Sequence, residues 1–246
     1  MASRLKCELA YDGTEFSGWQ IQPSGRTVQG VVESALKQIH KGREVRINGS
    51  GRTDAGVHAN GQVFHFDTDL SIPEGNWQKA LNAVLPKDVR VKSVQRAEPD
   101  FHARFDVVTK EYRYRVLRST EPDVFRRFYT AQIPYSLDVK AIKQAASHLV
   151  GTHDFSSFCA ANTDVKNKVR TLKTLEITEQ ADELVFRFVG NGFLYHMVRI
   201  VVGTLLQTGN GKLTAKDVSQ ILEAKDRTKA GPTAPGNGLF LWQVTY

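Results

Sequence analysis

Residues 4–11 read RLKCELAY, and residues 27–39 read TVQGVVESALKQI. In the first stretch apolar side chains alternate with polar ones, which predicts a half-buried strand. In the second stretch apolar side chains recur three and four positions apart behind Thr27, a residue suited to cap a helix. The chain is therefore predicted to begin with a strand followed by an amphipathic helix.

The strand and helix periodicities continue along the chain and predict an order of strands and helices that occurs twice. The first half continues with a short strand at Val45 and Ile47, a strand over 62–68, a helix over 77–85 that Pro86 ends, and a strand over 89–94. After residue 105 we expect a strand over 111–118, a helix carrying Val139 and Ile142, and a hairpin with arms 169–178 and 184–189. An apolar helix over 193–206 follows. The chain then continues with a helix opened by Thr214, with Asp217 as its capping-box partner, and ends with a strand over 239–245.

This order predicts an α+β fold of two ferredoxin-like (βαββαβ) halves, residues 1–105 and 106–246. Helices on one side of each antiparallel sheet would leave the other side open, and the two sheets are expected to join side by side. The active-site cleft is then expected between the halves. Ferredoxin-like topology also occurs in RNA-recognition modules, but neither half has their aromatic signature, so topology alone does not establish RNA binding.

Composition narrows the class of protein. The 246 residues are 41% hydrophobic, which is enough for a core without metals or crosslinks, and 33 Lys and Arg against 26 Asp and Glu give a net charge of +7. The positive balance favours a polyanionic partner such as nucleic acid. The two cysteines, Cys7 and Cys159, form no CxxC pair, so neither disulfides nor zinc are indicated. We expect a cytoplasmic protein, because no apolar stretch approaches the roughly 20 residues that span a bilayer and no secretory signal is evident.

Residues 48–61 read NGSGRTDAGVHANG and pack four glycines around three charged or titratable side chains. Gly51 and Gly56 have Walker spacing, but Val57 and His58 follow where a phosphate loop needs Lys and Ser or Thr. A Rossmann fingerprint requires a third glycine where Asp54 stands. Asp54 and His58 would chelate a metal on a helix, but the glycines disfavour a helix. Between a flexible hairpin connection and a binding loop, the density of charge favours the binding loop.

At this loop the sequence resembles the active-site motif of the tRNA pseudouridine synthase A family, in the segment GRTDAGVH at 51–58. The resemblance continues through DFHARF (100–105), KEYRY (110–114), DFSSF (154–158), FLYHMVR (193–199) and AKDR (224–227). It therefore covers essentially the whole chain.

The resemblance implies isomerisation of uridine in tRNA at positions 38 to 40 of the anticodon stem-loop by a homodimer without a cofactor or metal. Asp54 is then the catalytic carboxylate. It would act either as a nucleophile on the sugar or base or as a base that removes a sugar proton, and the sequence does not choose between these routes. Without the resemblance, Asp54 would equally well be a turn-forming residue.

Arg199 is expected to act beside Asp54. It interrupts the apolar run of the predicted 193–206 helix, where a buried guanidinium is costly without a partner. The resemblance implies that this arginine pairs with the catalytic aspartate and holds it ionised. The alternative is a solvent-facing arginine on an amphipathic helix.

Four further residues are expected to bind the substrate. By resemblance, Arg52 enters the RNA and helps to hold the target uridine out of its stack. Tyr112 stacks on the target uracil, and Leu239 forms a pocket wall; alternation alone would place both in the core. Lys110, at the start of the same strand as Tyr112, begins a predicted phosphate track whose other candidates are Arg113, Arg115, Arg126, Arg127, Lys166, Lys168 and Arg170.

Two rival functions share parts of this pattern. A non-catalytic RNA-binding protein with duplicated ferredoxin-like halves would fit the composition, but it has no need of a carboxylate facing phosphates. A nucleoside hydrolase or glycosylase would also use Asp54, but it would release a free base and lower the mass of the RNA.

Overall fold

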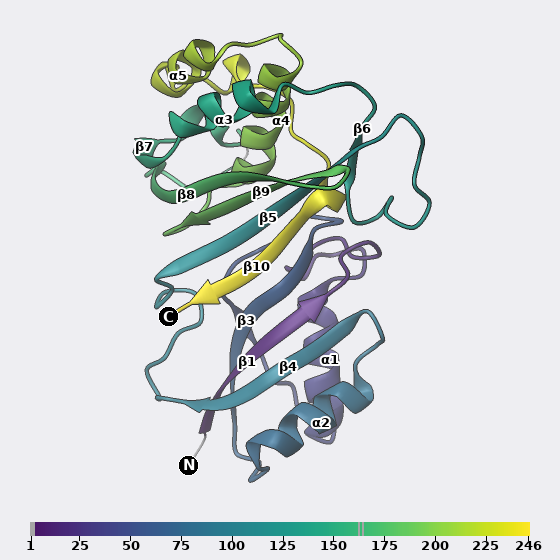
Figure 1. Cartoon of the computed structure of the whole chain (residues 1–246). Coiled ribbons are helices and arrows are strands. Elements are labelled where there is room, and N and C mark those ends of the chain that lie inside the picture. Colours follow the sequence, from purple (N-terminus) through teal and green to yellow (C-terminus); the bar gives the residue numbers. More distant parts are fainter. Residues whose placement is uncertain (1–2, 162, 164) are drawn as a thin grey trace. The chain divides into compact units, whose positions relative to one another are not determined.

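The computed structural model describes residues 3–161, 163 and 165–246, and the chain folds as two units (Figure 1). The first unit reaches to Val108 and also includes Phe240–Tyr246. The second unit is Thr109–Leu239. The last strand of the chain therefore returns to the unit in which the chain begins.

The first unit has the predicted order of elements. They are β1 (Ser3–Tyr11), α1 (Val28–Ile39), β2 (Asn48–Gly49), β3 (His58–Thr68), α2 (Glu74–Val84) and β4 (Val89–Ala97), joined at the end of the chain by β10 (Leu239–Thr245). The strands follow the order β4-β1-β3-β10, and β2 pairs with β3. Strand β1 is antiparallel to both β3 and β4, β2 is antiparallel to β3, and β10 is parallel to β3. The βαββαβ order predicted for this half is confirmed.

Local sequence accounts for these elements. The alternation in β1 buries Leu5, Cys7 and Leu9 on one face, as predicted. The Thr27 hydroxyl accepts a hydrogen bond from the Gly30 amide and so caps α1. The Asn82 side chain of α2 exchanges two hydrogen bonds with the backbone of Val91, which fixes this helix on β4.

In the second unit, strands β5 to β9 form a sheet with helices on one side (Figure 1). Its elements are β5 (Thr109–Arg118), β6 (Ala131–Ile133), α3 (Val139–Ser147), β7 (Gly151–Asp154), β8 (Val169–Gln180), β9 (Glu183–Gly190), α4 (Met197–Gly209), α5 (Ala215–Ala224) and the 3-10 turns η1 (Ser156–Phe158), η2 (Arg227–Lys229) and η3 (Gly236–Gly238). The strand order is β5-β9-β8-β7, with β6 parallel on β5. Thr214 and Asp217 form the predicted capping box of α5.

Several predicted boundaries were wrong, and three of them have a clear physical reason. Val45 and Ile47 are buried, but the short strand lies at Asn48–Gly49, because only these two residues pair with β3. Strand β3 begins at His58, four residues earlier than predicted, so the end of the glycine-rich segment belongs to a strand. Helix α4 begins at Met197, because His196 has a left-handed backbone (φ 60°) that a helix does not continue through.

The division of the chain differs from the predicted one in its last strand. Residues 240–246, assigned to the C-terminal half from the sequence, group with the first unit because β10 pairs with β3, with Phe240 opposite His58. The amide of Val108 also donates to the carbonyl of Thr245 (2.9 Å). The α+β class with mainly antiparallel strands is confirmed, while the ferredoxin-like duplication and the cleft stay predictions.

Acid is expected to destabilise the first unit through His65. This β3 side chain is only 3% exposed, and its Nδ1 accepts the Ala103 amide hydrogen (3.1 Å). Burial, helped by the positive charge of Arg4, lowers the pKa of His65 to about 4. The unfolded chain binds this proton near pH 6.5, so the folded state is destabilised progressively as the pH falls from 6.5 to 4, by about 1 to 3 kcal/mol.

The measurement is urea unfolding between pH 7.5 and 4.5 for the parent chain and for His65→Gln, whose amide oxygen keeps an acceptor for Ala103. The variant should lose less stability over this range. An equal loss in both proteins would show that other groups cause the acid sensitivity.

Candidate active site

The loop between β2 and β3 presents the predicted catalytic residue. Asp54 is half-buried, Arg52 is exposed, and Thr53 between them is buried. Three backbone hydrogen bonds fix the loop: Trp19 donates to the Thr53 carbonyl (3.1 Å), Gly56 to the Phe16 carbonyl (3.2 Å) and Val57 to the Asp54 carbonyl (3.2 Å). The loop is therefore built onto the segment that follows β1, which argues against a flexible hairpin connection.

Two glycines outside the quoted motif allow this close approach. A Cβ at Gly13 would lie 2.0 Å from the Val57 carbonyl oxygen. Gly18 has a φ of +99°, and a Cβ there would lie 2.7 Å from the Thr53 carbonyl oxygen. Residues 12–19 thus pack directly against the loop and support it. The supporting role of this segment was not predicted from the sequence. The pattern that could have indicated it is a pair of glycines among aromatic residues directly after the first strand.

Buried side chains complete the support of the loop. The Tyr11 hydroxyl hydrogen-bonds the Thr53 hydroxyl (2.8 Å), and burial raises the pKa of this phenol, which keeps it neutral. The Ser50 hydroxyl donates to the Gln62 side chain (2.6 Å), whose amide nitrogen donates to the Gly51 carbonyl (2.9 Å). These contacts fix the backbone just before Arg52 and the Thr53 side chain between Arg52 and Asp54.

His58 has a structural role. It is 1% exposed, its Nδ1 accepts the Gly13 amide hydrogen (2.9 Å), and its ring stacks on Phe240 with centroids 4.6 Å apart. No group of three or more His, Cys, Asp and Glu residues that would suit a metal ion occurs within the described part of the chain. The Nδ1 atom of His58 is thus engaged by the backbone of the same unit.

Arg52 is placed to reach a ligand. Its side chain is exposed, and its Nε donates to the Gln20 side-chain oxygen (3.1 Å). A hydrogen bond at Nε orients the planar guanidinium without burying it. Gln20 is a second supporting residue that the motif did not reveal.

In the second unit, Tyr112 and Tyr114 lie on the buried face of β5. Tyr112 is 8% exposed and contacts Phe193 edge to face, with centroids 5.0 Å apart. Tyr114 is fully buried, and its hydroxyl donates to the Pro235 carbonyl (2.8 Å). Tyr114 is therefore a core residue.

Arg199 lies in the first turn of α4 and is half-buried. Its Nε donates to the Ala234 carbonyl (2.7 Å), and the Ala234 amide donates back to the Arg199 carbonyl (3.0 Å). Burial raises the pKa of the Tyr114 phenol, and the positive charge of Arg199 opposes this rise. Arg199 is therefore neither fully buried nor fully exposed, and its role stays a prediction.

The remaining predicted residues also lie in the second unit. Leu239 is 5% exposed where β10 begins, and Lys110 is half-buried in β5 opposite Gly190 of β9. The structure thus places Arg52 and Asp54 on one loop of the first unit and the other four site residues in the second unit. The pairing of Arg199 with Asp54 stays a prediction.

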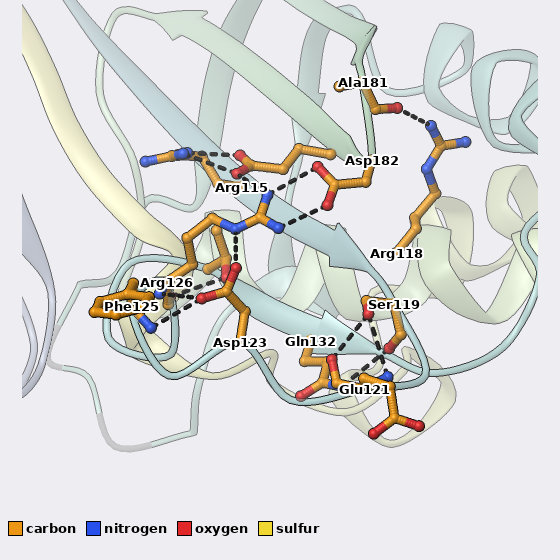
Figure 2. Close-up of polar contacts among 12 residues, drawn as sticks. Arg115, Arg118, Ser119, Glu121, Asp123, Phe125, Arg126, Gln132, Ala181 and Asp182 are labelled. Carbon is orange, nitrogen blue, oxygen red and sulfur yellow. Dashed lines mark hydrogen bonds and ion pairs between the residues drawn. The ribbon is translucent and has the colours of Figure 1, made fainter.

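Part of the predicted phosphate track is already neutralised by carboxylates (Figure 2). Arg126 binds Asp123 (2.6 Å) and Asp182 (2.7 Å). Arg115 binds Glu183 (2.8 Å), and Arg113 binds Glu111 (2.7 Å). A guanidinium already paired in this way gains less from a phosphate, so these three arginines are weak candidates for the track.

The family model and the sequence relatives agree with the motif. The family model described as tRNA pseudouridine synthase matches residues 9–106 and 145–246. The chain is 57% identical to tRNA pseudouridine synthase A 1 of Bacillus cereus over 99% of its own length and 98% of that protein, and 57% identical to tRNA pseudouridine synthase A of Geobacillus kaustophilus over 100% and 95%. A chain from the crystal structure of a Cbf5-Nop10-Gar1 complex aligns over 82% of this chain and 54% of that chain, with a TM-score of 0.35 and 14% identity. On the family match and the relatives, the chain belongs to the tRNA pseudouridine synthase family.

Proposed function

We propose that this isomerase converts uridine to pseudouridine at positions 38, 39 or 40 of the anticodon stem-loop of tRNA, with the Asp54 carboxylate as its catalytic group. The observation that carries the proposal is the half-buried Asp54 on a loop whose backbone is hydrogen-bonded on both sides. A carboxylate that faces polyanionic RNA opposes binding, so its fixed presentation argues for chemistry.

The reaction breaks the N1 glycosidic bond, turns the uracil and rejoins it through C5, which loses its hydrogen. A fixed carboxylate serves either as the nucleophile or as the base that removes a sugar proton, and both routes stay open. In either route the flipped uridine needs contacts that replace its lost stacking. We assign Tyr112, Arg52, Leu239 and Lys110 to that binding, and Arg199 to orienting Asp54; no cofactor or metal has a step in this scheme.

The proposed setting is the cytoplasm, and the proposed assembly is a homodimer. No helix in the described residues is both long enough and apolar enough to cross a membrane. The dimer rests on the family resemblance, and light scattering of the purified protein tests it.

Tritium release tests the reaction. The protein is incubated with unmodified tRNA transcript that carries tritium at uracil C5, and transcripts with cytidine at position 38, 39 or 40 serve as matched controls. We expect release of one tritium for each uridine converted, with RNA of unchanged mass. A binding protein without catalysis would release none, and a glycosylase would lower the RNA mass by releasing uracil.

A further inference from the structure

A turn after β4 holds one phenylalanine in solvent. Residues 100–106 read DFHARFD, and the Phe105 side chain in this turn is 75% exposed. A single exposed apolar residue is ordinary on a protein surface and needs no explanation by itself. Phe105 differs from such residues in two ways: hydrogen bonds fix the backbone of its turn, and an aromatic and a cationic side chain flank its ring.

The backbone of the turn is fixed from several directions. The amide of His102 donates to the Asp106 carboxylate (2.7 Å), and the amide of Phe105 donates to the His102 carbonyl (3.2 Å). Ala103 between them donates its amide to His65 of β3 (3.1 Å) and accepts a hydrogen bond from the Tyr246 hydroxyl (2.7 Å) at its carbonyl. The exposed position of Phe105 is therefore built into the unit.

The exposed ring is flanked by an aromatic and a cationic side chain. The His102 ring lies 4.3 Å from the Phe105 ring at 32°, so it covers one face of the phenylalanine. The Arg104 guanidinium is exposed and lies 5.9 Å from the Phe105 ring, at the outer limit of a cation–π contact. With three quarters of the side chain exposed, the other ring face is accessible.

The same arrangement continues next to the turn. The Lys6 ammonium lies 5.2 Å from the Phe101 ring and 4.0 Å from the Tyr246 ring. Aromatic rings interleaved with cations bind unpaired nucleic acid, because every base has a face that stacks and every nucleotide has a phosphate. A ring beside an arginine offers an unstacked base a stacking face and offers its neighbouring phosphate a positive charge.

We propose that Phe105 is a stacking platform for one unpaired nucleobase of the tRNA, with Arg104 at the phosphate next to that base. This base differs from the target uridine, whose proposed stacking partner is Tyr112 in the other unit. The inference rests on the proposed function only in taking tRNA as the substrate. Phe105 then contributes to tRNA affinity and not to the isomerisation step.

Equilibrium binding of unmodified tRNA transcript tests the platform with Phe105→Ala, Phe105→Leu and Phe105→Trp. We expect the Kd to rise about 10-fold for alanine and for leucine, which keeps an apolar side chain without a ring, and to stay within about 2-fold for tryptophan. The matched control is Phe125→Ala. Phe125 is 88% exposed on the loop that the Arg126 ion pairs hold (Figure 2), and its removal should leave the Kd within about 2-fold.

A second ligand isolates the base contact. A fully paired RNA duplex of similar length has no unstacked base to offer, so the parent chain and Phe105→Ala should bind it equally. Parent-like tRNA binding by Phe105→Leu would overturn the proposal, as would an equal loss in Phe125→Ala or an equal loss with the duplex. A change in sedimentation of Phe105→Ala would instead assign the ring to a contact between two copies of the chain.

Kinetics separate this inference from the proposed function. In the tritium assay, Phe105→Ala should raise KM about 10-fold while kcat at saturating tRNA stays unchanged. A fall in kcat alone would overturn the platform role. If the parent chain released no tritium at all, the proposed function would fail, but the contrast between tRNA and duplex in the binding assay would still decide the role of Phe105.

Discussion

Replacement of Asp54 by asparagine is expected to abolish tritium release and to leave tRNA bound. The change keeps nearly the same volume but removes the negative charge and the nucleophilic or basic oxygen. Turnover should fall by on the order of 10³-fold or more, to background, because no cofactor substitutes for the carboxylate. Binding should persist, and it should tighten slightly as one negative charge facing RNA is removed.

The neighbouring carboxylate Glu15 supplies a matched control. It is exposed on the segment that supports the loop, so Glu15→Gln removes the same unit of charge from the same region without touching the proposed chemistry. This variant should keep turnover within about 2-fold of the parent chain. Substantial turnover by Asp54→Asn in a preparation free of the parent enzyme would remove Asp54 from the catalytic role.

The support of Asp54 shows what the sequence could and could not predict. The motif drew attention to Asp54 itself, because a cluster of glycines around charged side chains is visible over a few residues. The segment that supports the loop lies about 40 residues earlier in the sequence. Its glycines Gly13 and Gly18 matter because they allow close contact with Val57 and Thr53. Local periodicity carries no information about such contacts, so only the structure reveals them.

The strands show the same distinction between local and distant information. The bounds of β10 are those predicted, Leu239 to Thr245, because alternation is a local property of the chain. The pairing of β10 with β3 could not be predicted in the same way, because it joins residues about 180 positions apart. The position predicted for the short strand β2 was wrong for a related reason. Val45 and Ile47 are buried, as their apolar side chains suggest, but a buried residue need not pair with a neighbouring strand.

Charge was the least predictable part of the candidate site. The excess of Lys and Arg correctly favoured a nucleic-acid partner, which the family match supports. Arg113, Arg115 and Arg126 became weaker candidates for the phosphate track, because they pair with Glu111, Glu183 and Asp182 of the same unit. Side-chain pairing depends on strand register, which composition cannot supply.

Removal of the ring at Tyr112 is expected to lower kcat/KM by about 100-fold, whereas removal of its hydroxyl alone should cost little. Tyr112→Phe keeps the stacking face and the contact with Phe193, so it should retain most of the activity. Tyr112→Leu keeps an apolar side chain in a position that is 8% exposed but loses the ring proposed to stack on the target uracil. Tritium release under subsaturating and saturating tRNA measures both effects.

A loss of core packing at Tyr112 would also lower kcat/KM, and a substitution of Phe188 serves as the control for this effect. Phe188 lies directly opposite Tyr112 in β9 and is 1% exposed, so Phe188→Leu removes a neighbouring ring at similar burial without touching the proposed substrate contact. Thermal unfolding sets a temperature at which every variant is folded, and there Phe188→Leu should stay within about 3-fold of the parent kcat/KM. Equal losses in Tyr112→Leu and Phe188→Leu would assign Tyr112 to the core, because a stacking partner of the uracil must matter more than the ring it packs beside.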